Sequence, residues 1–209
     1  MASFGIEMEL LIKPLAETLP LVTKHGYRPE NIPRLNMIAV HKALVEVLLE
    51  RNFPAELYDE DSGYQSKWQV AADASIRSNG DFVGVEIISK ILYINSEWTT
   101  EVDRFWGILI DNFEVRGDSS CGTHIHFSPN GGFTLLQLKA LAKFTTIFQP
   151  AVTALIPAAR RDTDWCHPNA EVVEGLKARY AAGRPVLFPW IENFPSKEVC
   201  SGVKYPRVK

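Results

Sequence analysis

Apolar and polar residues alternate along residues 4–12, which is the pattern of a β-strand with one buried face. Further segments have the residue types and lengths of strands, and they lie at 54–58, 67–73, 82–89, 113–115 and 121–128. In other segments apolar residues recur every three or four positions and predict helices, at 35–52, 96–111, 134–148 and 170–182. Asn79-Gly80 predicts a tight turn ahead of the strand at 82–89. The chain is therefore expected to have an α+β fold.

The polar face of the first predicted strand carries two carboxylates, Glu7 and Glu9. Two acids on one strand face repel each other, and no cationic residue lies between them. A bound cation would relieve that repulsion, although a solvated edge strand would show the same alternation. Glu86 is a third candidate, because it interrupts an apolar run and a buried carboxylate is costly unless it is paired or bound to metal.

The strand predicted at 121–128 places His124 and His126 on one face, about 6–7 Å apart. One metal ion, or a metal ion with a phosphate beside it, is within reach of both imidazoles. A polar strand face with two exposed histidines would show the same pattern. His41 differs, because it lies among the apolar residues of a predicted helix and is expected on the surface or in the packing of that helix.

The length, composition and charge of the chain limit the classes of protein to which it can belong. A chain of 209 residues with 46% hydrophobic and 22% charged residues suits one globular domain, with or without a helical appendage. A net charge of −3 and the lack of a Lys/Arg run argue against a nucleic-acid partner. No apolar run approaches the ~20 residues of a membrane span, and no secretory leader is recognisable. Three scattered cysteines do not form a disulfide framework, so a soluble, cytoplasmic protein is expected.

Three segments, in this order, resemble the amidoligase family, namely 4–9 (FGIEME), 73–89 (DASIR leading to VEIIS) and 122–128 (GTHIHFS). This family belongs to the carboxylate–amine ligases, which include glutamine synthetase and glutamate–cysteine ligase. The resemblance implies an antiparallel, funnel-like sheet of the glutamine synthetase catalytic type. Helices would pack on the outer face of the sheet, and its inner face would hold divalent metal ions and ATP.

The resemblance also implies roles for single residues. The metal ligands would be Glu7, Glu9, Glu86 and His124. Nucleotide contacts would come from His126 and Ser128. A catalytic cation facing phosphate or carboxylate would be Arg77, Arg160 or the neighbouring Arg161. Carboxylates with one histidine favour Mg²⁺ or Mn²⁺, as ATP-using enzymes require.

The expected function is an ATP-dependent ligase that joins a carboxylate to an amine through an acyl phosphate, with small molecules or peptides as substrates. Members of the family carry a further strand with a Glu-x-Arg element, and nothing after Asn169 matches it. The expectation is thus a single domain over residues 1–209 that lacks its C-terminal strand or strands. Two alternatives remain open: a non-catalytic domain that binds nucleotide or metal, and a zinc or iron enzyme. The latter would use His124 and His126 with His167 or Glu86.

Overall fold

The computed structural model describes most of the chain, namely residues 2–28, 30–31, 33–60, 66–158, 161 and 175–197. The chain divides into two compact units, Met1–Asn130 and Gly131–Lys209. The first unit holds a β-sheet with its helices, and the second holds helices. Each unit is described by itself below.

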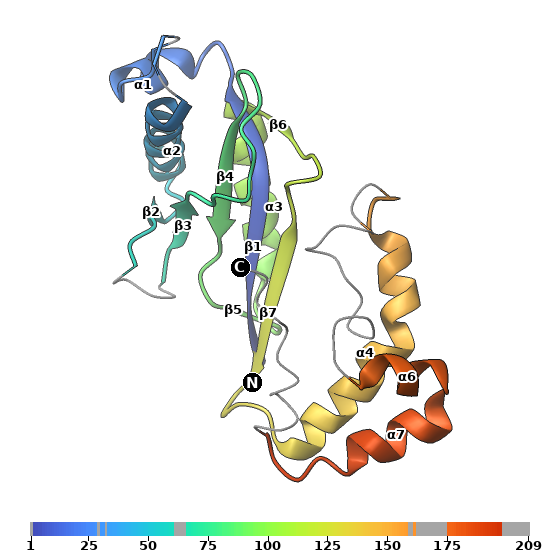
Figure 1. Ribbon diagram of the computed structural model, residues 1–209. Helices are drawn as coiled ribbons and strands as arrows, with labels where there is room; N and C mark the ends of the chain where they lie inside the picture. The colour runs from blue at the N-terminus through green and yellow to red at the C-terminus, as the bar shows by residue number, and fades with distance from the viewer. Residues whose placement is uncertain are drawn as a thin grey trace. The chain divides into compact units, whose positions relative to one another are not determined.

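One long strand, β1 (Ala2–Pro14), organises the first unit. Both of its edges are paired (Figure 1), so that Glu7 lies opposite Ile88 on one side and opposite His124 on the other. One edge pairs with β4 (Val83–Ile88) and β5 (Leu92–Tyr93). The other edge pairs with β7 (Thr123–Pro129) and β6 (Phe113–Arg116). Segments more than 100 residues apart in sequence are thus held together through β1.

Two more strands extend the sheet beyond β4. β3 (Trp68–Ala71) runs antiparallel to β4, and β2 (Ala55–Leu57) runs parallel to β3. The result is a seven-stranded, mostly antiparallel open sheet. The expected α+β class is confirmed, while the funnel implied by the family resemblance stays a prediction.

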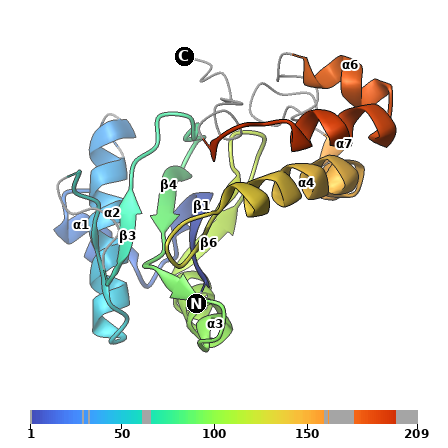
Figure 2. The same cartoon turned by 90° about the horizontal axis from the view of Figure 1, so that it is seen from below.

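Helices cover one face of this sheet. α2 (Pro33–Glu50) contacts β2, β3 and β4, α3 (Trp98–Asn112) contacts β6, and the short α1 (Leu19–Lys24) packs on α2 (Figure 2). Alternate residues of β1 and β4 enter the shared core, among them Ile6, Met8, Ile12, Val85 and Ile87. The remaining residues of these strands, including Glu7, Glu9 and Glu86, point to the opposite face. That face carries the candidate site.

Two predictions from the sequence are confirmed in the first unit, one for His41 and one for Asn79-Gly80. His41 is buried in α2 and donates from Nε2 to the carbonyl of Gly84, 2.9 Å away, so it is a packing residue. Asn79 and Phe82 exchange two backbone hydrogen bonds around Gly80, whose φ of +59° suits glycine. The helix α1 lies outside the segments predicted as helices, and its Pro20 occupies the first turn, where the missing N–H of proline costs nothing.

The second unit consists of helices in its described part. α4 (Leu135–Leu155) starts at Thr134, which forms a capping box with Gln137, and continues past Pro150. α6 (Leu176–Ala181) and α7 (Arg184–Glu192) share a small core of Leu176, Leu187 and Ile191. The predicted helix at 170–182 is described only from residue 175 onward. Within the described residues 131–158, 161 and 175–197 there is no strand. None of the described helices has the length and apolar character needed to cross a membrane.

Candidate functional site

Five chemically active side chains lie on the uncovered face of the sheet, and strand register brings them together. Glu9 of β1 lies opposite Glu86 of β4, while Glu7 of β1 lies opposite His124 of β7. His126 follows on β7, opposite Gly5. Side chains two residues apart on a strand share a face, so these five side chains lie next to one another on the three neighbouring strands β4, β1 and β7.

The first group joins Glu7, His124 and His126. His126 Nε2 lies 3.0 Å from Glu7 Oε2, and His124 Nδ1 lies 3.3 Å from the same oxygen. One donor atom from each residue lies within 4.8 Å of the others, so the three could hold a metal ion. The glutamate side chain is 16% exposed, whereas the imidazoles are more than half exposed. This group is thus anchored in the sheet and accessible to a ligand.

The second group consists of carboxylates, Glu9, Asp73 and Glu86, whose ligand atoms also lie within 4.8 Å of one another. Glu9 is buried and the other two are partly buried. Sequence reasoning missed Asp73 as a ligand, although it opens the segment 73–77. Its position depends on how the chain leaves β3, and no periodic pattern reports that path. A hydrogen bond from Ser75 N to Asp73 Oδ1 fixes the turn that starts there.

His124 connects the two groups. Its Nδ1 faces Glu7, and its Nε2 lies 3.6 Å from Glu9 Oε1. The four residues expected as metal ligands are therefore brought to one region of the sheet, with His124 between the acids. His126 lies one strand step farther along β7 and contacts Glu7.

Burial and neighbouring negative charge change the protonation of Glu86. Burial, followed by the charges of Glu7, Asp73 and Glu9, raises the pKa of Glu86 from its ordinary 4.5 to about 7, and His124 opposes this effect. A carboxyl with such a pKa is largely protonated below neutral pH. A divalent cation in this cluster would displace that proton and neutralise the neighbouring charges.

One end of the site is closed by a small apolar cluster of Leu11, Ile76 and Phe82, with Cys121 packed against it. Leu11 follows Glu9 on the same face of β1 and covers its buried side. The segment 73–77 can lie this close to β4 because residue 84 is glycine. A Cβ at Gly84 would lie 2.8 Å from Ile76 Cγ2 and 3.2 Å from Ile76 O.

Of the other expected site residues, those that the structure describes lie outside these two groups. Ser128 is exposed at the open end of β7, on the face that carries His126, and its hydroxyl donates to the carbonyl of Pro129. Arg77 is exposed, and its backbone N–H donates to Ser120 Oγ. The hydrogen bond from Ser120 lowers the pKa of Asp118, and the charge of Arg77 adds to this effect. Arg160 lies outside the described residues, and Arg161 donates to the carbonyls of Ala154 and Ile156 in the second unit.

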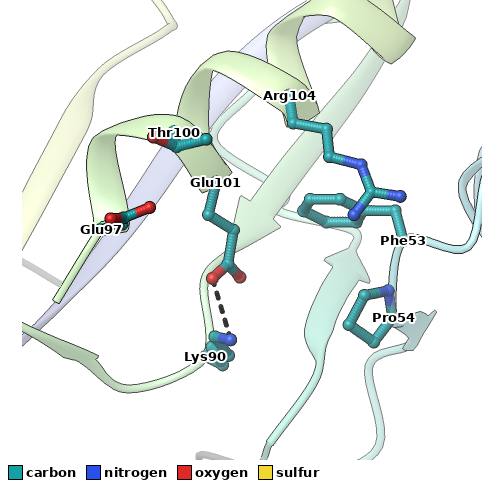
Figure 3. A pocket seen from close by; sticks show the side chains of 7 residues that line it. All are labelled: Phe53, Pro54, Lys90, Glu97, Thr100, Glu101 and Arg104. Atoms are coloured by element: carbon teal, nitrogen blue, oxygen red, sulfur yellow. Dashed lines mark ion pairs between the residues drawn. The ribbon is translucent and has the colours of Figure 1, made fainter.

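A hollow of about 300 Å³ lies on the helical side of the sheet, where α3 meets residues 53 and 54 (Figure 3). Among its charged side chains, Lys90, Glu101 and Arg104 already have partners in the protein. Lys90 pairs with Glu101 at 2.9 Å, and Arg104 contacts both the Phe53 ring and the carbonyl of Arg51. These interactions are sufficient to explain the residues as part of the packing between α3 and the sheet.

Comparison with known proteins agrees with the geometry. The sequence model of the family described as "Putative amidoligase enzyme" matches residues 1–184, which include the whole candidate site. Neither a curated protein nor a solved structure matches the chain. The chain therefore belongs to the putative amidoligase family.

Proposed function

We propose that this chain is an ATP-dependent ligase that joins a carboxylate to an amine. The observation that carries the proposal is the pair of adjoining ligand groups on one sheet face, in a chain of an amidoligase family. The family suggests a ligase that forms C–N bonds and acts on small molecules. The geometry supplies a face on which metal ions and a triphosphate can be held side by side.

The donor atoms fit divalent metal ions. Glu9, Asp73 and Glu86 offer only carboxylate oxygens, which suit Mg²⁺, and Glu7 with His124 adds a mixed set. The raised pKa of Glu86 supports this assignment, because burial and the charges of Glu7, Asp73 and Glu9 disfavour its ionised form, and a bound cation would favour that form. Bound there, divalent ions would neutralise charge on the β- and γ-phosphate oxygens of ATP.

The proposed reaction has two steps. An oxygen of the substrate carboxylate attacks the γ-phosphorus of ATP, which forms an acyl phosphate and releases ADP. The amine nitrogen then attacks the acyl carbon, so that the carbon–oxygen bond to phosphate breaks and the nitrogen loses a proton. Nearly all the work of the protein is positioning and charge neutralisation.

Residues at different positions in the site would perform different parts of this work. The apolar cluster at Leu11 and Ile76 limits water at the closed end, beside Glu9. At the other end, exposed His126 and Ser128 leave room for the nucleotide and the two substrates. Arg77 is a candidate for a cation that contacts phosphate or carboxylate, from a segment that begins at Asp73.

The test is ADP release in the presence of Mg²⁺-ATP and a panel of amino acids and amines. Hydroxylamine is included because it captures an acyl phosphate as a hydroxamate. Glu86→Gln should abolish both signals, since it removes a ligand charge at nearly constant volume. Glu114→Gln is the matched control, because Glu114 is partly exposed on β6, pairs with Arg116 and belongs to neither ligand group.

Two results would contradict the proposal. One is ADP release that does not depend on an acid or an amine, and the other is activity that survives Glu86→Gln. Tight binding of Mg²⁺-ATP without ADP release from any acid and amine would favour the alternative, a domain that binds nucleotide or metal without catalysis.

A further inference from the structure

The two groups of ligands differ in chemistry. Glu9, Asp73 and Glu86 offer oxygen alone, whereas Glu7, His124 and His126 offer two imidazole nitrogens and one oxygen. Oxygen ligands suit Mg²⁺ and also Mn²⁺, while imidazole suits Zn²⁺ and related transition ions and is not a usual ligand of Mg²⁺. Adjoining sites with these donor sets should therefore select different metals.

The spacing of the histidine group fits a single small ion. Bonds of ~2.0–2.2 Å to one ion place neighbouring ligand atoms about 3.0–3.4 Å apart in octahedral or tetrahedral geometry. The two measured separations, 3.0 Å from His126 Nε2 and 3.3 Å from His124 Nδ1 to Glu7 Oε2, lie in this range. Both imidazoles thus approach one carboxylate oxygen at separations that are compatible with a shared ion as well as with hydrogen bonds.

Glu9 is placed to orient His124 for this role. His124 Nε2 faces Glu9 Oε1 at 3.6 Å, while Nδ1 faces the Glu7 group. A metal-binding histidine usually donates its other ring N–H to a carboxylate, which fixes the tautomer and makes the ligand more basic. Glu9, which is 7% exposed, would perform this function from within the sheet.

We propose that Glu7, His124 and His126 form a site for a first-row transition ion such as Mn²⁺, Co²⁺ or Zn²⁺, distinct in preference from the all-carboxylate group beside it. His126 is then a metal ligand rather than a nucleotide contact. The inference rests on the proposed function, because it names the metal preference of one half of that site.

The test measures binding of the metals alone, by titration calorimetry with Mn²⁺ and Zn²⁺ in the absence of nucleotide. His126→Ala should weaken the tighter site by at least ~10–100-fold, the range known for residues that support metal ligands. His25→Ala is the matched control, because His25 pairs with Glu46 at the end of α1 and should leave the affinity unchanged. Thermal melts of both variants show that they fold, as expected for an imidazole that is 56% exposed.

A second measurement counts the imidazoles directly. Electron spin echo modulation of bound Mn²⁺ should report two nitrogen ligands in the original chain and one in His126→Ala. Millimolar Mg²⁺ should leave this signal in place. Unchanged affinity in His126→Ala, a single nitrogen in the original chain, or displacement of Mn²⁺ by Mg²⁺ would each overturn the inference.

The outcomes separate this inference from the proposed function. If His126→Ala lowers ADP release but binds Mn²⁺ as the original chain does, His126 contacts nucleotide and only the inference fails. If the chain binds Mn²⁺ through both imidazoles and yet releases no ADP with any acid and amine, the inference stands and the proposed function fails.

Discussion

Glu86 lies where acidic side chains from three parts of the first unit meet. Glu9 is its direct neighbour across the β1–β4 pair, and Asp73 and Glu7 are close enough to raise its pKa further. The group is therefore unfavourable to folding until a cation or a proton neutralises it. The arrangement that would bind a cation thus lowers the free energy of unfolding of the cation-free chain.

We expect the metal-free chain to lose stability as the pH rises from about 4.5 to about 7. In this range the folded chain keeps a proton on Glu86 that the unfolded chain has released, so the free energy of unfolding falls with pH and then levels off. Glu86→Gln should remove this slope, which urea unfolding at several pH values in a chelating buffer would measure. The same slope in the variant would contradict the assignment.

His41 should contribute an effect of the opposite sign. Burial lowers the pKa of His41, against a smaller opposing effect of the bond to Gly84, so the folded chain keeps it neutral. Below its ordinary 6.5 the unfolded chain takes up a proton that the folded chain does not, and stability is lost as the pH falls. His41→Gln keeps a donor near the Gly84 carbonyl and should flatten the acid side of the profile. An unchanged acid slope would show that His41 is charged when folded.

Most site residues could be predicted singly because each lies within a regular strand. Alternation alone places Glu7 with Glu9 and His124 with His126, since the side-chain period of a strand is fixed at two. It does not give the pairing of β1 with both β4 and β7, which brings the two pairs together. Asp73 was missed for a related reason. It lies beyond β3, in the segment 73–77, and the path of that segment depends on the contact of Ile76 with Gly84 of β4.

At the scale of elements, one glycine controls how a connecting segment lies on the sheet. Gly84 occupies the site face of β4, and Ile76 packs onto it so closely that a methyl group would clash with side-chain and backbone atoms. The same segment begins with Asp73, so the contact helps to position a ligand. The absence of a side chain at one position thus shapes the site.

Gly84→Ala should cost about 1–3 kcal/mol of stability, because overpacking forces the segment away from β4. It should also weaken Mg²⁺ binding through displacement of Asp73. Gly107→Ala in α3 is the control, since nothing lies within 4 Å of the added Cβ, and alanine in a helix should stabilise by up to ~1 kcal/mol. Calorimetric melts with and without Mg²⁺ measure both effects; a neutral Gly84→Ala would mean that the segment has room to move.

The helix α7 shows where the hydrophobic pattern misleads. Residues 184–192 hold two prolines and two aromatic residues, a composition that does not favour a helix. In the structure Pro185 occupies the first turn, and Pro189 lies inside a helix whose Leu187 and Ile191 pack on Leu176. Contacts within the second unit therefore outweigh the local cost of proline, which propensity alone does not reveal.

The first unit as a whole is a sheet that its helices cover only in part. Ile125 and Phe127 of β7 lie opposite Ile6 and Phe4 on the helical side, yet they are 68% and 47% exposed. α2 and α3 pack on the other strands. The apolar pattern of β7 correctly predicts a strand, but it does not reveal that this strand lies beyond the helical layer.

Replacing isoleucine by alanine on β4 and on β7 should measure this difference in burial between the two strands. Ile87→Ala, on β4 and 1% exposed, should cost about 2–5 kcal/mol because it leaves a cavity in the core. Ile125→Ala should stay within ~0.5 kcal/mol, as for most surface changes. Chemical unfolding of the two variants gives both values. A comparable loss at Ile125 would show that the apolar side of β7 is covered in solution.

The pairing of β1 with strands at both edges also sets the order in which the chain can fold during synthesis. β1 leaves the ribosome before its partners, and the last of them, β7, ends at Pro129. At ~5–20 residues per second, about 6–23 s pass before that partner has been made. Until β7 has been made, the most heavily bonded strand of the sheet keeps one open edge, even after β4 has paired with the other. Nascent chains should therefore depend on protection from aggregation far more than the finished protein does.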